Sequence, residues 1–377
     1  MGWFMRQDLI QNFLNNKELI NKRYLNGKSK FFFSCENGRV DEVRELMKSR
    51  ILDPNSEDEE GRTPLAISCI NAHIEILTLL LEDNRTRVNT RSKDGKTPLY
   101  LACEKGNVDV VQLLINTPGI DFHQPDYCNK TPFFTACENG HEKIVKLFLE
   151  AKNVVGHELN FKDSFGDTPF YIACEKGHLE VAKMLLKDLR IDVNKFGGNG
   201  DTPFCAACSK GHTEVVRLLL DNKRVDINWN YPGKFSPLLV ACQSSNLEVT
   251  KMLLNDKRVK LDSDWQNDWT PLSISCFFGN VNIVKYILSC EKSVNIKHRN
   301  CENKTAKEII FDELRRGKSW WESEEEYNKK RQGYLEIIQI LEGYEKDPVG
   351  MIFKLQEESG ILGTFYFYFY FISILFS

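Results

Sequence analysis

Twelve cysteines are the residues of this 377-residue chain best suited to chemistry. Such a set could form disulfides, hold zinc or supply a reactive thiolate. Their spacing argues otherwise, because one position of a repeating unit holds Cys69, Cys103, Cys137, Cys174, Cys208, Cys242 and Cys276, and Cys35 extends the series upstream. Equivalent helices of successive repeats lie roughly 8–10 Å apart, whereas a disulfide needs Cα atoms within about 7 Å. We expect small buried apolar side chains that remain thiols in a reducing compartment.

Other chemically suggestive residues follow the same period. Cys205 adds a Cys-x-x-Cys pair with Cys208, so a redox or metal role is kept as a minor alternative. Gly95-Lys96-Thr97 resembles the end of a phosphate-binding loop, but Thr90 stands where that motif needs glycine. One loop position recurs in His73, His141, His178 and His212. Residues dispersed along an axis cannot share a metal, so we expect these histidines to pack and cap loops, and we predict no catalytic, cofactor or metal residue.

Thr-Pro and Ser-Pro dipeptides set the period. Their first residues lie 34 apart, except for 37 before Thr168. The hydroxyl caps a helix start, worth about 1 kcal/mol, and proline suits the first helical position. A glycine such as Gly106 then ends the helix, and an apolar run such as 108–115 predicts a second one. Repeats two to eight begin at Thr63, Thr97, Thr131, Thr168, Thr202, Ser236 and Thr270; Ser29 begins repeat one and Thr305 an irregular repeat nine.

This unit resembles the ankyrin repeat, with matches such as 94–99 (Asp-Gly-Lys-Thr-Pro-Leu) and 211–216 (Gly-His-Thr-Glu-Val-Val). The resemblance covers about residues 29–343 and implies an all-α solenoid of helix-turn-helix repeats with short turn or hairpin tips. The family's histidine after Thr-Pro-Leu is replaced by Ala66, Tyr100, Phe134, Tyr171, Cys205, Leu239 and Ser273. We therefore expect apolar packing in place of histidine hydrogen bonds between repeats.

The remaining segments divide the chain around these repeats. Residues 1–28 look amphipathic over 6–25 and are predicted to form an N-terminal helical cap; eight repeats fill 29–304. Residues 305–346 are predicted to form an irregular ninth, capping repeat with a charged insert, and 347–360 a linker. Residues 361–377 are uncharged and aromatic. They are either a short tail anchor or an artefact of the gene end, and any membrane contact is expected only through them.

Aromatic residues in repeats seven and eight stand out. The resemblance implies that partners meet the turn tips, the residue before Thr-Pro and the two residues that end the first helix. In the middle repeats these positions are mostly hydrophilic, but here they hold Tyr231, Phe235, Trp265, Trp269, Phe277 and Phe278. Trp229 lies nearby in the sequence and is included among the candidate residues. Clustered aromatic residues at exposed sites favour a binding surface on the concave side. The alternative is that Trp320 and Trp321 fold back and bury this patch.

The function implied is a non-catalytic scaffold or adaptor that binds a protein, without a cofactor. A formal net charge of −3 gives no general attraction for nucleic acid, and the N-terminus lacks the apolar core of a secretory signal. We expect a cytoplasmic monomer; the alternative is an adaptor tethered to a membrane by residues 361–377. The acidic stretch 57–60 is expected to be a solvated turn tip, or otherwise to contact a basic partner.

Overall fold

The computed structural model describes residues 16–151, 158–229, 234–260, 268–290, 294–320 and 322–359. It divides into two compact units, residues 1–199 and 200–377, which are treated separately. Over the described ranges every regular element is a helix, apart from one antiparallel bridge between Arg23 and Ser29. This agrees with the all-α architecture predicted from the period.

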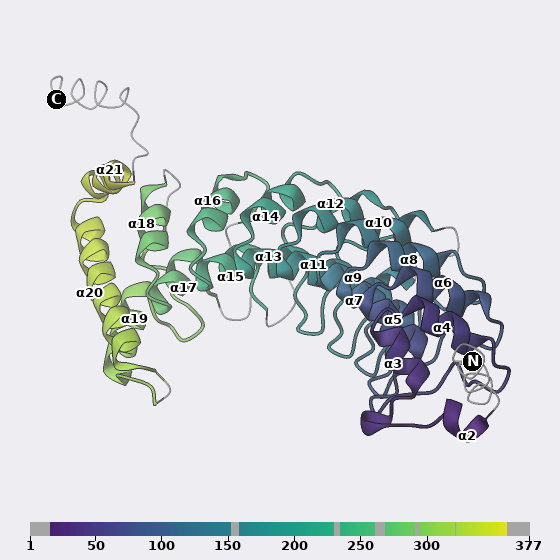
Figure 1. Ribbon diagram of the computed structural model, residues 1–377. Coiled ribbons are helices and arrows are strands. Elements are labelled where there is room, and N and C mark those ends of the chain that lie inside the picture. The colour runs from purple at the N-terminus through teal and green to yellow at the C-terminus, as the bar shows by residue number, and fades with distance from the viewer. Residues whose placement is uncertain are drawn as a thin grey trace. The chain divides into compact units, whose positions relative to one another are not determined.

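Unit one contains repeats one to five, each with two helices (Figure 1). The first helices are α3 (Lys30–Glu36), α5 (Pro64–Asn71), α7 (Pro98–Lys105), α9 (Pro132–Glu138) and α11 (Pro169–Lys176). The second helices are α4 (Val40–Met47), α6 (Ile74–Glu82), α8 (Val108–Ile115), α10 (Glu142–Glu150) and α12 (Leu179–Lys187), and a 3-10 turn, η2, spans Glu158–Asn160. First helices contact first helices along the row, so each repeat packs on its neighbours.

Unit two contains repeats six to nine. Its paired helices are α13 (Pro203–Lys210) and α14 (Thr213–Leu220), α15 (Pro237–Gln243) and α16 (Leu247–Asn255), and α17 (Pro271–Phe277) and α18 (Val281–Ser289). Repeat nine begins with α19 (Ala306–Arg316), which is followed by α20 (Glu324–Lys346) and α21 (Pro348–Glu358).

Local chemistry explains where the helices begin and end. The Thr97 hydroxyl accepts the Tyr100 amide at 3.2 Å, and Pro98 occupies the first helical position. At the other end Gly106 has a φ of 76°, and a Cβ there would lie 2.7 Å from the His141 ring. Glycine is therefore required twice over, by its backbone angle and by the approach of the next repeat.

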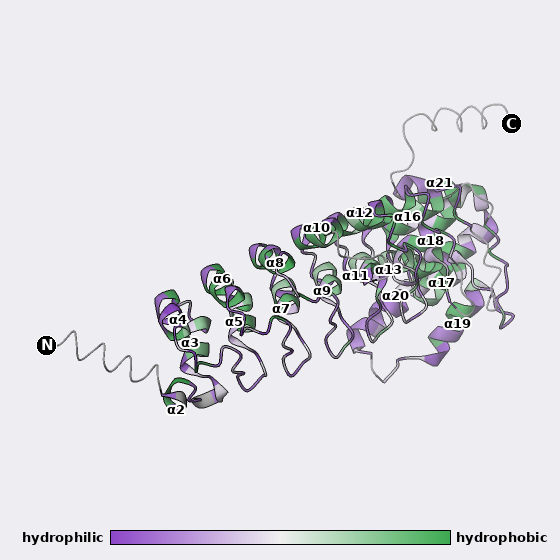
Figure 2. Ribbon diagram, turned by 90° about the vertical axis from the view of Figure 1, so that its right-hand side faces the viewer, coloured by the Kyte–Doolittle hydropathy of each residue, from purple (hydrophilic) through white to green (hydrophobic). Residues whose placement is uncertain are grey.

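The second helices bury one face. In α8 the side chains of Val110, Val111 and Leu114 are completely buried, while Asp109 is exposed. Figure 2 shows the same mixture of hydrophobic and hydrophilic residues along α6, α8 and α10. This is the amphipathic pattern that the sequence predicts for the second helix of each repeat.

The described part of the N-terminal segment is not one long helix. Helix α2 covers only Lys17–Ile20, and a 3-10 turn, η1, spans Leu25–Gly27. The side chain of Asn21 donates to the Ile51 carbonyl at 2.8 Å and accepts the Asp53 amide at 2.9 Å. The same pair of hydrogen bonds, one donated and one accepted by the asparagine side chain, recurs at Asn55, Asn89, Asn160 and Asn228. The repeat register therefore already operates upstream of Ser29; the rest of the predicted cap, residues 1–15, lies outside the described residues.

The segment 347–360 was expected to be a linker, and that expectation is wrong for most of it, because α21 forms there. Asp347 caps the helix by accepting the Gly350 amide at 3.0 Å, and Pro348 follows. Leu355 is 1% exposed, and the Gln356 side chain donates to the Ser289 carbonyl of α18 at 2.9 Å. Tertiary packing on α18 and α20 thus orders this segment. The aromatic tail, 361–377, lies outside the described residues, and among the residues described no helix has the length and apolarity needed to cross a membrane.

Candidate functional site

The cysteine series is structural. Cys69, Cys103 and their equivalents are fully buried, and burial raises the pKa of Cys205 to about 11 and that of Cys242 to about 12. A thiol with such a pKa carries almost no thiolate at neutral pH. All twelve cysteines are free, as expected from the distance between repeats. The prediction that the in-register cysteines are small buried apolar residues is confirmed.

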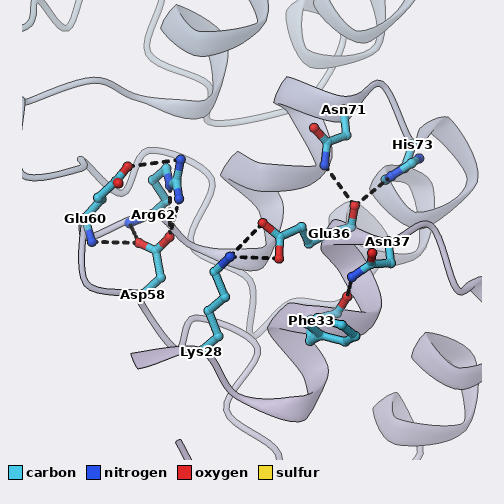
Figure 3. Close-up of polar contacts among 9 residues, drawn as sticks. All are labelled: Lys28, Phe33, Glu36, Asn37, Asp58, Glu60, Arg62, Asn71 and His73. Carbon is cyan, nitrogen blue, oxygen red and sulfur yellow. Dashed lines mark hydrogen bonds and ion pairs between the residues drawn. The ribbon is translucent and has the colours of Figure 1, made fainter. Parts of the chain in front are cut away.

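Loop histidines and asparagines tie each repeat to the one before it. In Figure 3 the side chains of Asn71 and His73 both reach the Glu36 carbonyl, at 2.8 and 3.1 Å. His141 and His178 make the same contact with the carbonyls of Glu104 and Glu138. These carbonyls end first helices and would otherwise lack a partner within the helix. The predicted capping role of His73, His141 and His178 is confirmed, and no group of metal-ligating side chains occurs among the described residues.

The residues that replace the family histidine are buried between repeats. Their exposures range from 1% for Phe134 and Cys205 to 4% for Tyr171. Tyr100 also keeps one polar contact, because its hydroxyl donates to the Asp126 carboxylate at 3.0 Å. Apolar packing therefore takes the place of the histidine, as the sequence predicts.

The acidic stretch 57–60 is only partly a solvated tip. Asp58 is 6% exposed, and one of its oxygens accepts the backbone amides of Glu60 and Arg62. Its other oxygen lies 2.7 Å from the Arg62 guanidinium (Figure 3). Asp58 therefore shapes the turn, while Glu57, Glu59 and Glu60 remain exposed.

Two surface positions of each repeat lie side by side. We call them the paired positions: the residue directly before the first Thr or Ser, and the residue seven places after that Thr or Ser. In repeat one they are Lys28 and Glu36, whose ammonium and carboxylate are 2.8 Å apart (Figure 3). Ion pairs at the same positions join Lys96 to Glu104 at 2.7 Å, Lys130 to Glu138 at 2.8 Å and Lys304 to Asp312 at 3.0 Å.

A buried ring lies beneath three of these ion pairs. The Lys130 ammonium is 5.5 Å from the centre of the Phe134 ring, and Lys28 and Lys96 lie 5.6 and 5.4 Å from their rings. Burial by itself would lower the pKa of Lys130, but the hydrogen bond and charge of Glu138 raise it. The ring and the carboxylate thus both contact the lysine ammonium, and the distance from the ammonium to the ring centre is typical of cation–π contacts.

Repeat eight places rings at the paired positions themselves. Trp269 and Phe277 meet edge to face, with centroids 5.4 Å apart and planes at 72°. Phe278 continues the contact at 5.0 Å and 80°. The buried position three residues after the first Thr or Ser, which holds the ring in repeats one, three and four, is called the floor. In repeat eight the floor is Ser273, whose hydroxyl and backbone exchange capping hydrogen bonds with Thr270. We call Trp269, Phe277 and Phe278 the aromatic cluster; all three are half-buried.

The other predicted binding residues are distributed differently. Phe235 occupies the first paired position of repeat seven and is half-buried, as is Trp229. Tyr231 and Trp265 lie outside the described residues. The structure therefore brings Trp269, Phe277 and Phe278 together and places Phe235 at the equivalent position of the preceding repeat.

Helix α20, rather than Trp320, borders the aromatic cluster. The Tyr334 hydroxyl donates to the Phe277 carbonyl at 2.6 Å, and burial raises the pKa of this tyrosine. The alternative expected from the sequence was that Trp320 and Trp321 bury the patch. Trp320 is 91% exposed, so this residue does not bury it. Trp321 lies outside the described residues. The cap thus contacts the Phe277 backbone through Tyr334, and the three rings of the cluster are half-buried.

Two strongly exposed aromatic rings were not among the binding residues predicted from the sequence. Tyr127 and Phe165 are 69% and 72% exposed on the turn tips before repeats four and five. The backbone joins successive tips: the Tyr127 amide donates to the Asp94 carbonyl at 3.2 Å, and the Ser164 amide to the Cys128 carbonyl at 2.8 Å. Aligning all tips by their distance from Thr would have revealed both rings.

Comparison with known proteins agrees with this geometry. A family model described as ankyrin repeats, in three copies, matches residues 5–92, 31–126, 84–155, 118–196, 151–231, 192–264 and 224–300. No curated protein matches the chain. The first match includes residues upstream of Ser29, where Asn21 already follows the repeat register. Repeats of this kind generally serve as modules for protein–protein interaction and are typically non-catalytic. With matches spanning residues 5–300, the chain belongs to the ankyrin repeat family.

Proposed function

We propose that the chain is a non-catalytic scaffold that binds a protein partner on the concave side of repeats seven and eight. Trp269, Phe277 and Phe278 are the principal anchors, and Phe235 extends the surface into repeat seven. One observation carries this proposal: the paired positions that hold a solvated ion pair in repeats one, three, four and nine hold a tryptophan and a phenylalanine in repeat eight.

Exposure at these positions supports the proposal. The side chains of Lys130 and Glu138 remain 21% and 24% exposed although they pair with each other. Trp269 and Phe277 use equivalent backbone positions and are also half-exposed, so they present apolar surface to solvent. Aromatic residues in partly desolvated clusters contribute most of the binding energy at protein interfaces.

The edge-to-face contacts suit such a role. Rings that hold one another in place lose little side-chain freedom when a partner binds, so less of the contact energy is offset by ordering. A partner that inserts an apolar side chain against the three rings would bury them without displacing an ion pair. The partner surface expected is therefore apolar at its centre and polar at its rim.

The test compares two double variants of the full chain. Trp269→Ala with Phe278→Ala removes two anchors, and Lys130→Ala with Glu138→Ala is the matched control on another repeat. Affinity capture with mass spectrometry identifies proteins retained by the wild type, and calorimetry with a purified candidate then measures its affinity. We expect at least about a tenfold weaker complex for the aromatic variant and little change for the control.

Two results would contradict the proposal. Equal affinity of wild type and aromatic variant would show that the cluster does not bind the partner. A large fall in the melting temperature of the aromatic variant alone would show that the rings stabilise the cap instead, and loss of capture would then reflect unfolding.

A further inference from the structure

Repeat one presents to solvent a side chain that the later repeats bury. Phe33, four residues after Ser29, is 45% exposed. The equivalent residues of the other repeats of unit one are at most 6% exposed; they are Ile67, Leu101, Thr135 and Ile172. Tyr24, on the turn that precedes α3, is 56% exposed. Two rings are therefore accessible beside α3 and α4, which Figure 1 shows at the end of the row of repeats in unit one.

These two rings line a groove of about 600 Å³. The charged residues that line it with them are Lys28, Lys30, Arg39 and Glu42. Glu42 is the third residue of α4, and at the same place the later second helices of unit one have a completely buried aliphatic residue: Ile76, Val110, Ile144 and Val181. An occupant of the groove therefore meets a charged group where a further repeat would need an apolar one, so the groove is not built to receive another repeat.

Cations outnumber carboxylates in the groove. Glu42 lies 3.1 Å from the Lys30 ammonium and 3.4 Å from the Arg39 guanidinium. Lys28 pairs with Glu36 at 2.8 Å (Figure 3). Three cations and two carboxylates leave one positive charge within these pairs.

The turn beside the groove increases this positive charge. Lys22 and Arg23 directly precede Tyr24, and the Lys22 ammonium lies 6.0 Å from the centre of the Tyr24 ring. On the next turn tip Glu59 supplies one further carboxylate, and its backbone amide donates to the Asn26 carbonyl at 3.0 Å. Five cations against three carboxylates leave this end of unit one with a net charge of +2, although the whole chain carries −3.

Arg39 is the group best placed to hold an anion. Its guanidinium lies over the Phe33 ring, 5.2 Å from the ring centre, and its side chain is 55% exposed. Only Nη1 contacts Glu42, and within the described part of the chain Nε and Nη2 have no hydrogen-bond partner. Because a guanidinium has five N–H donors in one plane, Arg39 can still donate two parallel hydrogen bonds to a carboxylate.

We propose that this groove binds an acidic segment of a protein partner, with one carboxylate on Arg39 and one apolar side chain against the rings of Phe33 and Tyr24. The net positive charge selects acidic residues, and the exposed rings supply the apolar contact. A volume of about 600 Å³ suits a short peptide segment rather than a folded domain.

This surface is separate from the aromatic cluster of repeat eight. It uses residues of unit one alone, and its partner segment is acidic where the partner surface at repeat eight is apolar. Trp269→Ala should therefore bind an acidic probe like the wild type, so the two proposals can fail separately.

The probe is a rhodamine-labelled peptide of sequence Glu-Glu-Phe-Glu-Glu, titrated into the full chain at low salt and followed by anisotropy. The neutral peptide Gln-Gln-Phe-Gln-Gln has the same length and the same ring. We expect the neutral peptide to bind at least about tenfold more weakly, because it loses the carboxylates that meet Arg39 and the surrounding cations.

Helix α4 offers a charge-matched control for Arg39. Arg39→Gln and Arg44→Gln remove the same charge from the same helix, but Arg44 pairs with Glu75 at 2.8 Å and does not line the groove. We expect Arg39→Gln to bind the acidic peptide about three- to tenfold more weakly than Arg44→Gln.

A second pair of variants tests the rings. Phe33→Ala should weaken the acidic peptide, whereas Tyr127→Ala should not. Tyr127 is a matched control because its exposed ring also lies over a guanidinium, 4.9 Å from that of Arg91. Thermal unfolding of both variants shows whether either change disturbs the fold.

Three results would overturn the proposal. Equal weakening by Arg39→Gln and Arg44→Gln would be a net-charge effect, and no weakening by either would exclude Arg39. Equal affinity for the acidic and neutral peptides would remove the charge selection. Residues 1–15 are the other candidate occupant: if they fill the groove, the wild type does not bind the probe and Phe33→Ala lowers the melting temperature.

Discussion

Repeats four and eight share a backbone plan and differ in what they present to solvent. In repeat four the ring of Phe134 forms the floor, 1% exposed, and Lys130 and Glu138 cover it with an ion pair. In repeat eight the floor is Ser273, and the rings of Trp269 and Phe277 lie at the surface. Moving aromatic residues from the floor to the paired positions converts a solvated surface into an apolar one without altering the helices.

The largest expected effect is on the floor of repeat four. Phe134→Ala removes a fully buried ring and should destabilise unit one by about 3–5 kcal/mol, through lost burial and the cavity left behind. Ser273→Ala, at the same position of repeat eight, should cost only about 1 kcal/mol, because it removes a capping hydrogen bond and little volume. Urea unfolding monitored by circular dichroism measures both. Similar losses for the two variants would show that the floors do not differ in the way described.

The next effect concerns the surface of repeat eight. Replacing Trp269 with Lys and Phe277 with Glu copies the paired positions of repeat four onto repeat eight. Partner affinity, measured by calorimetry, should fall at least about tenfold because the apolar anchors are lost, while the fold persists because these positions tolerate an ion pair elsewhere. If the folded double variant bound the partner as tightly as the wild type does, the aromatic cluster would not be the binding surface.

The smallest effect is a dependence on pH in unit one. Because the folded state raises the pKa of Asp167 above its ordinary value of 3.8, ionisation of this group opposes folding as the pH rises through that range. Asp167→Asn should therefore raise the melting temperature at pH 7, and the gain should vanish near pH 3. Asp83 is the control of opposite sign. Its hydrogen bond from Arg85 lowers the pKa, so its contribution is present at pH 7 and lost in acid.

For Asp83→Asn the melting temperature at pH 7 should fall instead. Melting curves from pH 3 to pH 8 distinguish the two variants. If Asp167→Asn raised the melting temperature by the same amount at every pH, the charge of Asp167 would not be the cause of the change in stability.

The repeat plan was predictable because its determinants are local. Thr97, Pro98 and Gly106 mark a helix start and end within ten residues, and the register of Cys103 indicates a buried position. Helix α21 was missed because its order depends on packing against α18, and Met351, Ile352 and Phe353 are consecutive apolar residues rather than a clear helical stripe. The edge-to-face contacts of Trp269 and Phe277 depend on side-chain geometry, which sequence spacing does not specify.

The candidate residues were found because they break the pattern of the other repeats, whereas the lysine, ring and glutamate arrangement keeps that pattern and was overlooked. Each of its members is ordinary by itself, and their relation becomes visible only when the three positions are compared across repeats. Asp167 illustrates the difference. By itself it is an ordinary acidic residue, but the equivalent position of repeats three and four holds Lys96 and Lys130, so the charge at this position is reversed in repeat five.

The loop side chains that reach back to a preceding carbonyl also determine how the structure would yield under tension. His73, His141 and His178 each secure one repeat to its neighbour and to nothing more distant. Pulling on one end of unit one would therefore load these links in series, and the end repeat would detach first. Each release would free about 34 residues, whose fully extended length is roughly 110–120 Å. Under tension, unit one is therefore expected to unfold one repeat at a time, beginning at its end.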